Sequence, residues 1–144
     1  MQPHTKWTGL AATLLLTALL ADHASTAQSP PAQVRTTISH SMPQLDGTHL
    51  KVTVVEVAYA PGTSSKPHSH HCPVVGYIAE GAIRYQVKGE PETLYKAGES
   101  FYEAANGVHQ VSANASNTEP AKLIAYFLCD HDTPLSVAVP DGGK

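Results

Sequence analysis

The feature that most constrains the fold is a succession of short, β-rich segments that begins near residue 34. These segments are rich in valine, isoleucine, threonine and tyrosine, and Gly, Pro, Asn or Asp interrupts them at short intervals. No segment after residue 27 shows sustained helical periodicity. Many short strands at this spacing predict an all-β sandwich or barrel. We expect strands at Val34–Ser39, Leu50–Ala60, Lys66–His70, Val74–Ala79, Ala82–Lys88, Thr93–Tyr95, Ser100–Glu103, His109–Ala113, Lys122–Leu128 and Ser136–Val139.

The N-terminus has the pattern of a secretory signal peptide. His4 and Lys6 precede an apolar run, Gly9–Ala21, and small residues lead to an expected cleavage site after Ala27. A retained membrane anchor is the alternative, but thirteen residues are short for crossing a bilayer. We therefore expect a secreted or periplasmic protein with no stable membrane association after cleavage. The expected organisation is a signal peptide over residues 1–27, a flexible polar tether over 28–33 and one domain over 34–144.

The charge distribution excludes two classes of partner. The net charge is −3 at pH 7, and no basic run or patch occurs anywhere in the chain. Nucleic acids and anionic membrane surfaces attract basic proteins, so neither is expected to bind here.

A pair of histidines suggests a metal site. His68 and His70 lie two residues apart, and alternate residues of a β-strand point to the same face. If this stretch is a strand, two imidazoles project together, which is half of a typical transition-metal site.

Two motifs resemble those of the cupin superfamily, in the form found in small, single-domain, secreted bacterial members. They are Gly62-x5-His68-x-His70-x10-Gly81 and Gly98-x10-His109, separated by the sixteen residues 82–97. The resemblance covers about Tyr59 to Asn114. It implies a single cupin-type double-stranded β-helix, also called a jelly-roll barrel, and it says less about function because one fold hosts many chemistries.

The resemblance implies that His68, His70 and His109 converge on one divalent transition metal ion. It also implies a glutamate ligand four residues after the second histidine, where this sequence has Val74. We therefore expect a neutral three-histidine site that could accept iron, manganese, nickel, copper or zinc. The second motif departs from the family too, because alanine replaces the usual proline at 104 and Asn106 replaces the usual glycine. Asn tolerates left-handed backbone, so a turn at Asn106-Gly107 remains compatible.

Glu103 is the candidate catalytic residue. It lies six residues before His109 and on the strand face of Phe101, so it could point into the barrel as a replacement ligand or a general base. The alternative is a residue at the rim that forms a surface ion pair. Four aromatic residues either line the pocket or belong to the core: Tyr77, Tyr85, Phe101 and Tyr102.

The remaining histidines and the cysteines carry weaker signals. His71 is expected to face solvent or lie in a loop, and His40, His49 and His131 are expected at the surface. Cys72 and Cys129 could form a disulfide, remain free thiols, or place one thiol near the metal.

The expected partner is a small-molecule ligand or substrate, and there are two hypotheses for the function. The first is a metal-dependent oxygenase, or a related lyase or isomerase, with Glu103 as a proton-transfer group. The second is a non-catalytic module that binds or senses a metal or small ligand. We favour the first. A homodimer that exchanges the Val34–Ser39 strand is also expected.

Overall fold

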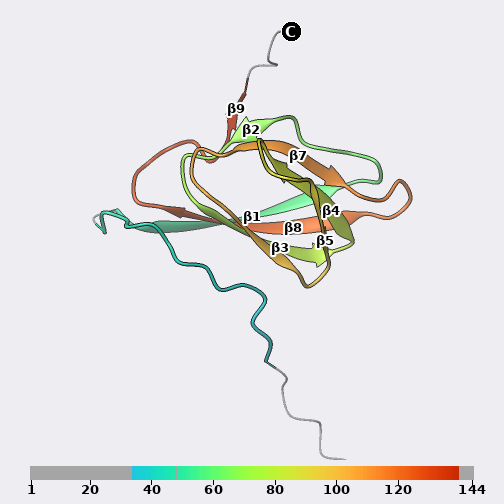
Figure 1. Cartoon of the computed structure of the whole chain (residues 1–144), viewed down its shortest axis with the longest axis horizontal. Coiled ribbons are helices and arrows are strands. Elements are labelled where there is room, and N and C mark those ends of the chain that lie inside the picture. Colours follow the sequence, from blue (N-terminus) through green and yellow to red (C-terminus); the bar gives the residue numbers. More distant parts are fainter. Residues whose placement is uncertain (1–33, 48, 140–144) are drawn as a thin grey trace, which may run out of the picture. The chain divides into compact units, whose positions relative to one another are not determined.

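The structure is a computed structural model that describes residues 34–47 and 49–139 (Figure 1). The expected signal peptide and tether lie outside the described residues. Within that range the chain forms nine strands and no helix, which confirms the all-β prediction. Accordingly, no described segment is a helix of the length and hydropathy needed to cross a membrane.

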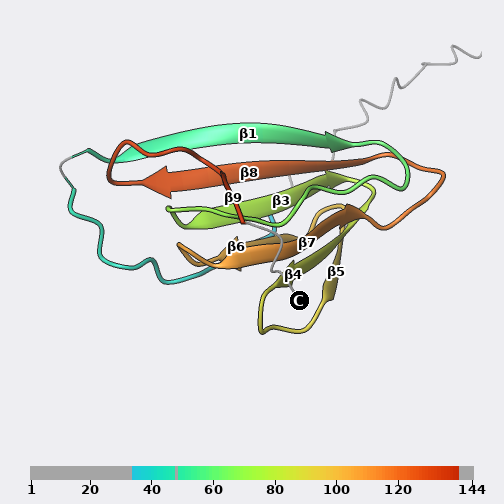
Figure 2. The ribbon, with the colours of Figure 1, turned by 90° about the horizontal axis from the view of Figure 1, so that it is seen from above.

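The strands form two antiparallel sheets that face each other, as expected for a jelly roll (Figure 2). The first sheet has the order β1 (Lys51–Tyr59), β8 (Ala121–Cys129), β3 (Val74–Glu80), β6 (Ser100–Glu103). The second has the order β5 (Thr93–Lys96), β4 (Ala82–Val87), β7 (Val108–Asn114), β2 (His68–Ser69), β9 (Val137–Ala138).

The core forms because alternate side chains of each strand turn inward. On β8, Leu123, Ala125 and Phe127 are buried, while the residues between them are partly or fully exposed. Gly76 of β3 lies against the ring of Phe101 on β6, and a Cβ atom at this position would collide with that ring. The two sheets therefore pack through inward faces that the alternation in the sequence specifies.

The turn next to the second motif forms as the sequence predicts. Asn106 has a φ of 63°, in the left-handed region that Asn tolerates. Its backbone N–H donates to the carbonyl oxygen of His70 at 2.6 Å. This turn therefore fixes the backbone of one predicted metal ligand.

The predicted strand Val34–Ser39 is wrong. The segment has no strand pairing, and it contacts β6 and the preceding turn through side chains: Arg35 donates to the carbonyl oxygen of Gly98 at 2.6 Å, and Ser100 donates to Thr37 at 3.0 Å. Most of its side chains are exposed, so it has no apolar face to bury against a sheet. Propensity alone was therefore misleading here.

The predicted strand Lys66–His70 is shorter than expected. Only His68 and Ser69 pair as β2, between β7 and β9. Pro67 has no N–H to donate, so the hydrogen-bond ladder cannot continue through it.

Cys72 and Cys129 form a disulfide, which resolves the three alternatives for these residues. Both cysteines are buried, and the bridge joins the loop after His70 to the end of β8. It spans 57 residues of sequence. A loop of that length lowers the entropy of the unfolded chain by an amount worth about 4 kcal/mol.

We expect the Cys72→Ala/Cys129→Ala double variant to lose about 4 kcal/mol of unfolding free energy, because its unfolded chain is no longer constrained. Urea denaturation of the oxidised wild type and of the variant measures the difference, and wild-type protein denatured under reducing conditions is the control. Equal urea midpoints would contradict the structural role of the bridge.

Candidate metal centre

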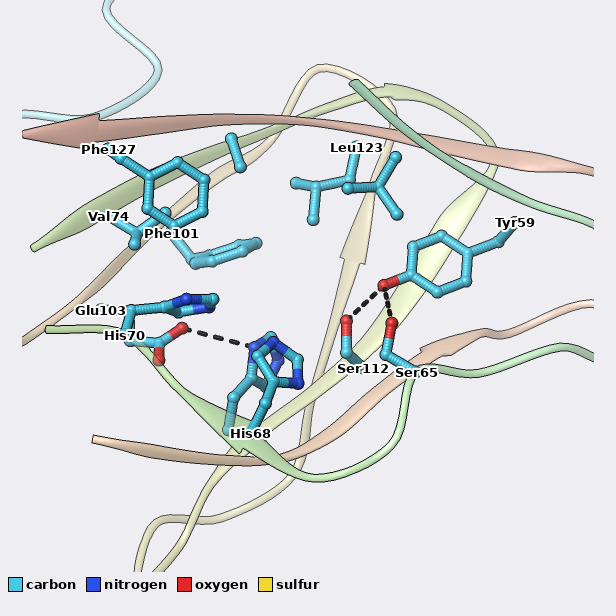
Figure 3. Close-up of a pocket in the computed structure, with 13 residues that line it drawn as sticks. Tyr59, Ser65, His68, His70, Val74, Phe101, Glu103, Ser112, Leu123 and Phe127 are labelled. Carbon is cyan, nitrogen blue, oxygen red and sulfur yellow. Dashed lines mark hydrogen bonds and ion pairs between the residues drawn. The ribbon is translucent and has the colours of Figure 1, made fainter. Parts of the chain in front are cut away.

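The three predicted ligands meet inside the barrel (Figure 3). His68 on β2 is the direct cross-strand partner of His109 on β7, and His70 follows β2. One nitrogen from each ring lies within 4.8 Å of the others. Two metal–nitrogen bonds of about 2.1 Å each separate their nitrogen atoms by at most about 4.2 Å. Two nitrogens that lie 4.8 Å apart would therefore move slightly closer together around an ion.

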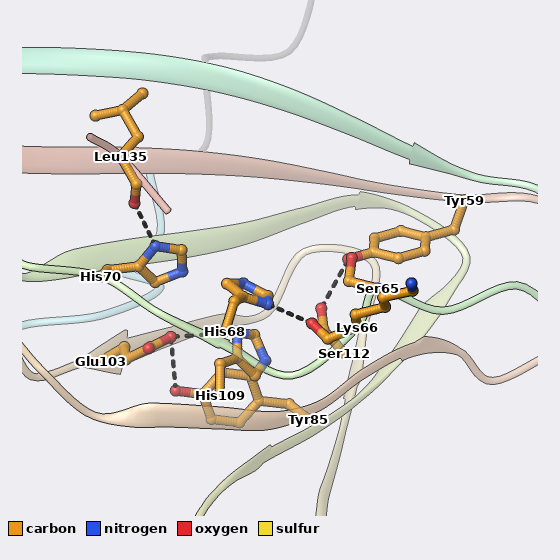
Figure 4. Close-up of polar contacts among 10 residues, drawn as sticks. All are labelled: Tyr59, Ser65, Lys66, His68, His70, Tyr85, Glu103, His109, Ser112 and Leu135. Carbon is orange, nitrogen blue, oxygen red and sulfur yellow. Dashed lines mark hydrogen bonds and ion pairs between the residues drawn. The ribbon is translucent and has the colours of Figure 1, made fainter. Parts of the chain in front are cut away.

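Hydrogen bonds fix the tautomers of two rings (Figure 4). His68 Nδ1 lies 2.7 Å from the carbonyl oxygen of Lys66, and His70 Nδ1 lies 2.6 Å from that of Leu135. A carbonyl oxygen only accepts, so each Nδ1 carries the proton and donates it. Each Nε2 therefore keeps a lone pair for a metal ion, in the arrangement that metal-binding histidines commonly adopt.

The third ring is buried and lacks a well-formed hydrogen bond. His109 is 3% exposed, and neither of its ring nitrogens meets a described residue in good hydrogen-bond geometry, although the backbone of Val111 is near enough to favour the protonated ring weakly. Burial, followed by the nearby rings of His68 and His70, lowers the pKa of His109 to about 3. Burial also lowers the pKa of His70. Neutral imidazoles with an unpartnered buried nitrogen have the donor chemistry that a divalent transition metal needs, so these residues fit such an ion.

Glu103 lies inside the barrel and not at its rim. It is the cross-strand partner of Val74, and it is 2% exposed. Its Oε2 lies 3.4 Å from His109 Nδ1 and accepts a long hydrogen bond, also 3.4 Å, from the Tyr85 hydroxyl. Its Oε1 has no hydrogen-bond partner among the described residues. The carboxylate therefore approaches His109 from the Nδ1 side of its ring.

Burial raises the pKa values of Glu103 and of its hydrogen-bond donor, Tyr85. It raises the pKa of Glu103 to about 7, and the hydrogen bond from Tyr85 opposes the change. Burial and the Glu103 charge raise the pKa of Tyr85 as well, so the phenol stays protonated and remains a donor. A cation held by His109 would favour the ionised carboxylate.

Two neighbouring spaces adjoin the histidines. The inner cavity has a volume of about 70 Å³, and its lining is Val57, Tyr59, Ser65, His68, His70, Val74, Phe101, Glu103, His109, Ser112, Leu123, Ala125 and Phe127. The vestibule is larger, about 650 Å³, and its lining is Val55, Val57, Ser65, Lys66, Pro67, His68, His70, Phe127, Leu135, Ser136 and Ala138. Five residues line both spaces, so a ligand that enters the vestibule reaches the histidines directly.

The aromatic residues divide into three groups. Phe101 lines the inner cavity, whereas Tyr85 is buried behind Glu103 and His109. Tyr77 and Tyr102 line neither space, and the ring of Tyr102 stacks on His40 with centroids 3.6 Å apart. Of the four aromatic residues that were expected either to line the pocket or to belong to the core, only Phe101 lines the pocket.

The other histidines lie at the surface, as predicted. His71 is exposed, and its Nδ1 contacts the Asn106 side chain at 3.1 Å. His40, His49 and His131 are exposed as well.

Sequence reasoning missed a cluster of three hydroxyls in the inner cavity. The Tyr59 hydroxyl lies 3.0 Å from Ser65 Oγ and 2.7 Å from Ser112 Oγ. Strict alternation from His109 would turn Ser112 outward. The pairing of β4 with β7 shifts by one residue between His109 and Val111, which brings Ser112 back to the inner face. A bulge of this kind leaves no clear signal in the sequence.

The comparison with protein families decides the identity of the fold. The model of the cupin domain matches residues 55–127, which is half of the chain and includes both histidine motifs. The chain belongs to the cupin family. No curated protein sequence matches this cupin.

Solved structures share its fold at low sequence identity. The DMSP lyase DddQ from Ruegeria pomeroyi is 16% identical with a TM-score of 0.56, over 65% of this chain and 45% of that one. An oxalate oxidase in complex with the substrate analogue glycolate is 19% identical with a TM-score of 0.52, over 74% and 63%. This cupin thus spans less than two thirds of either protein. A cupin superfamily protein from Desulfitobacterium hafniense is 16% identical with a TM-score of 0.50, over 70% and 84%.

We expect His109→Ala to abolish metal binding, because it removes one of the three donors of the site. Elemental analysis of protein purified without a histidine tag should find about one ion per chain in the wild type and none in the variant. The matched control is His131→Ala, an exposed histidine outside the site, which should keep its metal. Metal content that is unchanged in His109→Ala would contradict the site.

We expect Glu103 to make the stability of the metal-free protein depend on pH. Its pKa is raised from 4.5 to about 7 on folding, so its contribution is present below about pH 4.5 and is lost as the pH rises through 7. The unfolding free energy of the wild type, relative to Glu103→Gln, should fall by about 2–3 kcal/mol between pH 5 and 8. Urea denaturation in a chelator measures it, and a difference that is constant with pH would contradict the burial of an ionisable group.

Proposed function

We propose that this cupin is a metal-dependent enzyme, an oxygenase or a related lyase or isomerase, that acts on a small organic molecule. The observation that carries the proposal is a buried, unpartnered carboxylate oxygen of Glu103 in the same small cavity as three metal-binding nitrogens. A site built only to hold a metal does not require such an oxygen, because leaving it buried without a hydrogen bond costs free energy.

The three histidines would hold the ion, and iron, manganese, nickel, copper or zinc each suits imidazole donors. When bound, the ion supplies Lewis-acid polarisation of a substrate oxygen and, if it is redox-active, activation of dioxygen. The three ligands are neutral, and Val74 occupies the position where a carboxylate ligand was expected. The full charge of the ion is therefore available to attract and polarise a substrate oxygen.

Glu103 would serve as the proton acceptor. Its Oε2 faces His109 Nδ1 and the Tyr85 hydroxyl, which together hold the carboxylate in place. Its Oε1 has no such contact, so it is the atom that would receive a proton from a substrate C–H or O–H bond. The electron pair of that bond would stay on the substrate, next to the position where the three histidines would hold a cation.

The solved structures support an enzyme of this general kind and nothing narrower. Two of them are of enzymes, a DMSP lyase and an oxalate oxidase, and these catalyse different classes of reaction. Their identity to this cupin is below 20%, so their substrates are not carried over.

A non-catalytic module that binds a metal or small ligand is the second candidate. The observation that favours it is Val74, because a site without its expected carboxylate ligand loses one negative charge that would help to retain the ion. In such a module Glu103 would only orient His109.

We also propose that the protein is exported and pairs as a homodimer. The disulfide supports export, because such bonds persist in oxidising compartments, and the apolar run Gly9–Ala21 supports a signal peptide. The edge strand β1 supports pairing, because Val52 and Val54 are more than half exposed on it. Exchange of Val34–Ser39 has no support, because this segment is not a strand.

We expect metal-loaded protein to turn over a member of a panel of phenols, diketones and short hydroxy or keto acids, with and without dioxygen. Oxygen uptake and product analysis measure turnover. Glu103→Gln should keep the metal and lower kcat roughly 100-fold or more, which is the usual size of a proton-transfer contribution. His131→Ala is the control and should match the wild type. Turnover that is unaffected in Glu103→Gln would contradict the proton-transfer role, and ligand binding without any turnover would favour the second candidate.

A further inference from the structure

We propose that Tyr59, Ser65 and Ser112 form a hydrogen-bond-donating subsite for an oxygen atom of the substrate. This inference rests on the proposed function, because it needs a metal ion at the three histidines to hold the other end of the same molecule. The three hydroxyls come from β1, the loop before β2, and β7. All three line the inner cavity with the histidines (Figure 3).

The first argument is a count of protons. Three hydroxyls carry three protons, and the cluster contains two hydrogen bonds, from Tyr59 to Ser65 and from Tyr59 to Ser112. Each bond uses one proton. One O–H is therefore left without an acceptor among the described residues, whichever way the bonds are directed. All three hydroxyls line the inner cavity, so an acceptor that enters the cavity can receive the spare O–H and complete the cluster.

The second argument is the contrast between the cluster and its surroundings. Apart from the histidines and Glu103, the rest of the inner lining is apolar, and it includes Val57, Leu123 and Phe127. Polar groups in such a cavity are placed where they fix the orientation of a ligand. The cavity has a volume of about 70 Å³, so the part of a ligand that it holds is small.

The third argument is the charge along the route of entry. Lys66 is the only lining residue of the vestibule that carries a formal charge at neutral pH, and it is exposed at that opening. A cation at the entrance, a metal ion held by three neutral ligands and a spare O–H donor all attract anionic oxygen, and they outweigh the one carboxylate of the cavity, Glu103. The substrate class that fits is therefore a short carboxylic acid, with one oxygen on the metal side and another at the hydroxyls.

The test uses the full chain loaded with cobalt(II), whose visible spectrum reports on anions that reach the metal. Acetate is the two-ended probe, and chloride is the probe that can contact the metal without reaching the hydroxyls. The Tyr59→Phe/Ser65→Ala/Ser112→Ala variant removes every hydroxyl and leaves no polar partner behind, so it is expected to fold. Ser112→Ala alone is the second variant, and Tyr77→Phe, outside the cavity, is the matched control.

We expect the triple variant to bind acetate roughly tenfold or more weakly than the wild type, with chloride binding unchanged. Tyr77→Phe should bind both anions as the wild type does, and Ser112→Ala should weaken acetate binding in the same direction. Acetate binding that is equal in all four proteins would overturn the subsite while leaving the metal centre intact. If instead cobalt fails to bind the wild type, the proposed function fails first, and the two failures are thereby distinguished.

Discussion

The candidate site depends on one very short strand pairing. β2 contains only His68 and Ser69, and its pairing with β7 places His68 directly across from His109. A strand pairing of two residues cannot hold three ligands in place by itself, so other interactions stabilise the chain on either side of it. The Asn106 N–H binds the His70 carbonyl oxygen, and Cys72 ties the following loop to β8. These constraints bring three imidazoles together.

The charge of the site distinguishes this cupin from the family pattern. A carboxylate was expected as a ligand at Val74, and the structure has one on the cross-strand partner, Glu103. The shift by one strand changes its role, because the Oε2 of Glu103 lies 3.4 Å from the Nδ1 of His109, one of the predicted ligands. It can orient the ring and accept a proton without neutralising the ion. The same cavity is lined at another point by hydroxyls, which suits an oxygen-bearing anion.

The sequence was sufficient for the strands because they depend on local rules, namely the alternation of side chains and the turn residues. The meeting of His68, His70 and His109 was implied by the resemblance of the two motifs to those of cupins, and the structure brings the three rings together. The errors and omissions come from interactions that local rules do not contain. Val34–Ser39 has strand propensity but no face to bury, and Ser112 turns inward only because of a register shift in the pairing of β4 with β7. The disulfide could not be predicted, because the distance between Cys72 and Cys129 is known only from the fold.

The most direct test of this account is the coordination of a bound metal, measured by X-ray absorption on protein that was loaded with one ion per chain. The account predicts three imidazole nitrogens from His68, His70 and His109, with the remaining positions filled by water or another exchangeable ligand and a spectrum unchanged in Glu103→Gln. A protein carboxylate in the coordination sphere that disappears in Glu103→Gln would contradict it, as would an ion bound with fewer than three imidazoles.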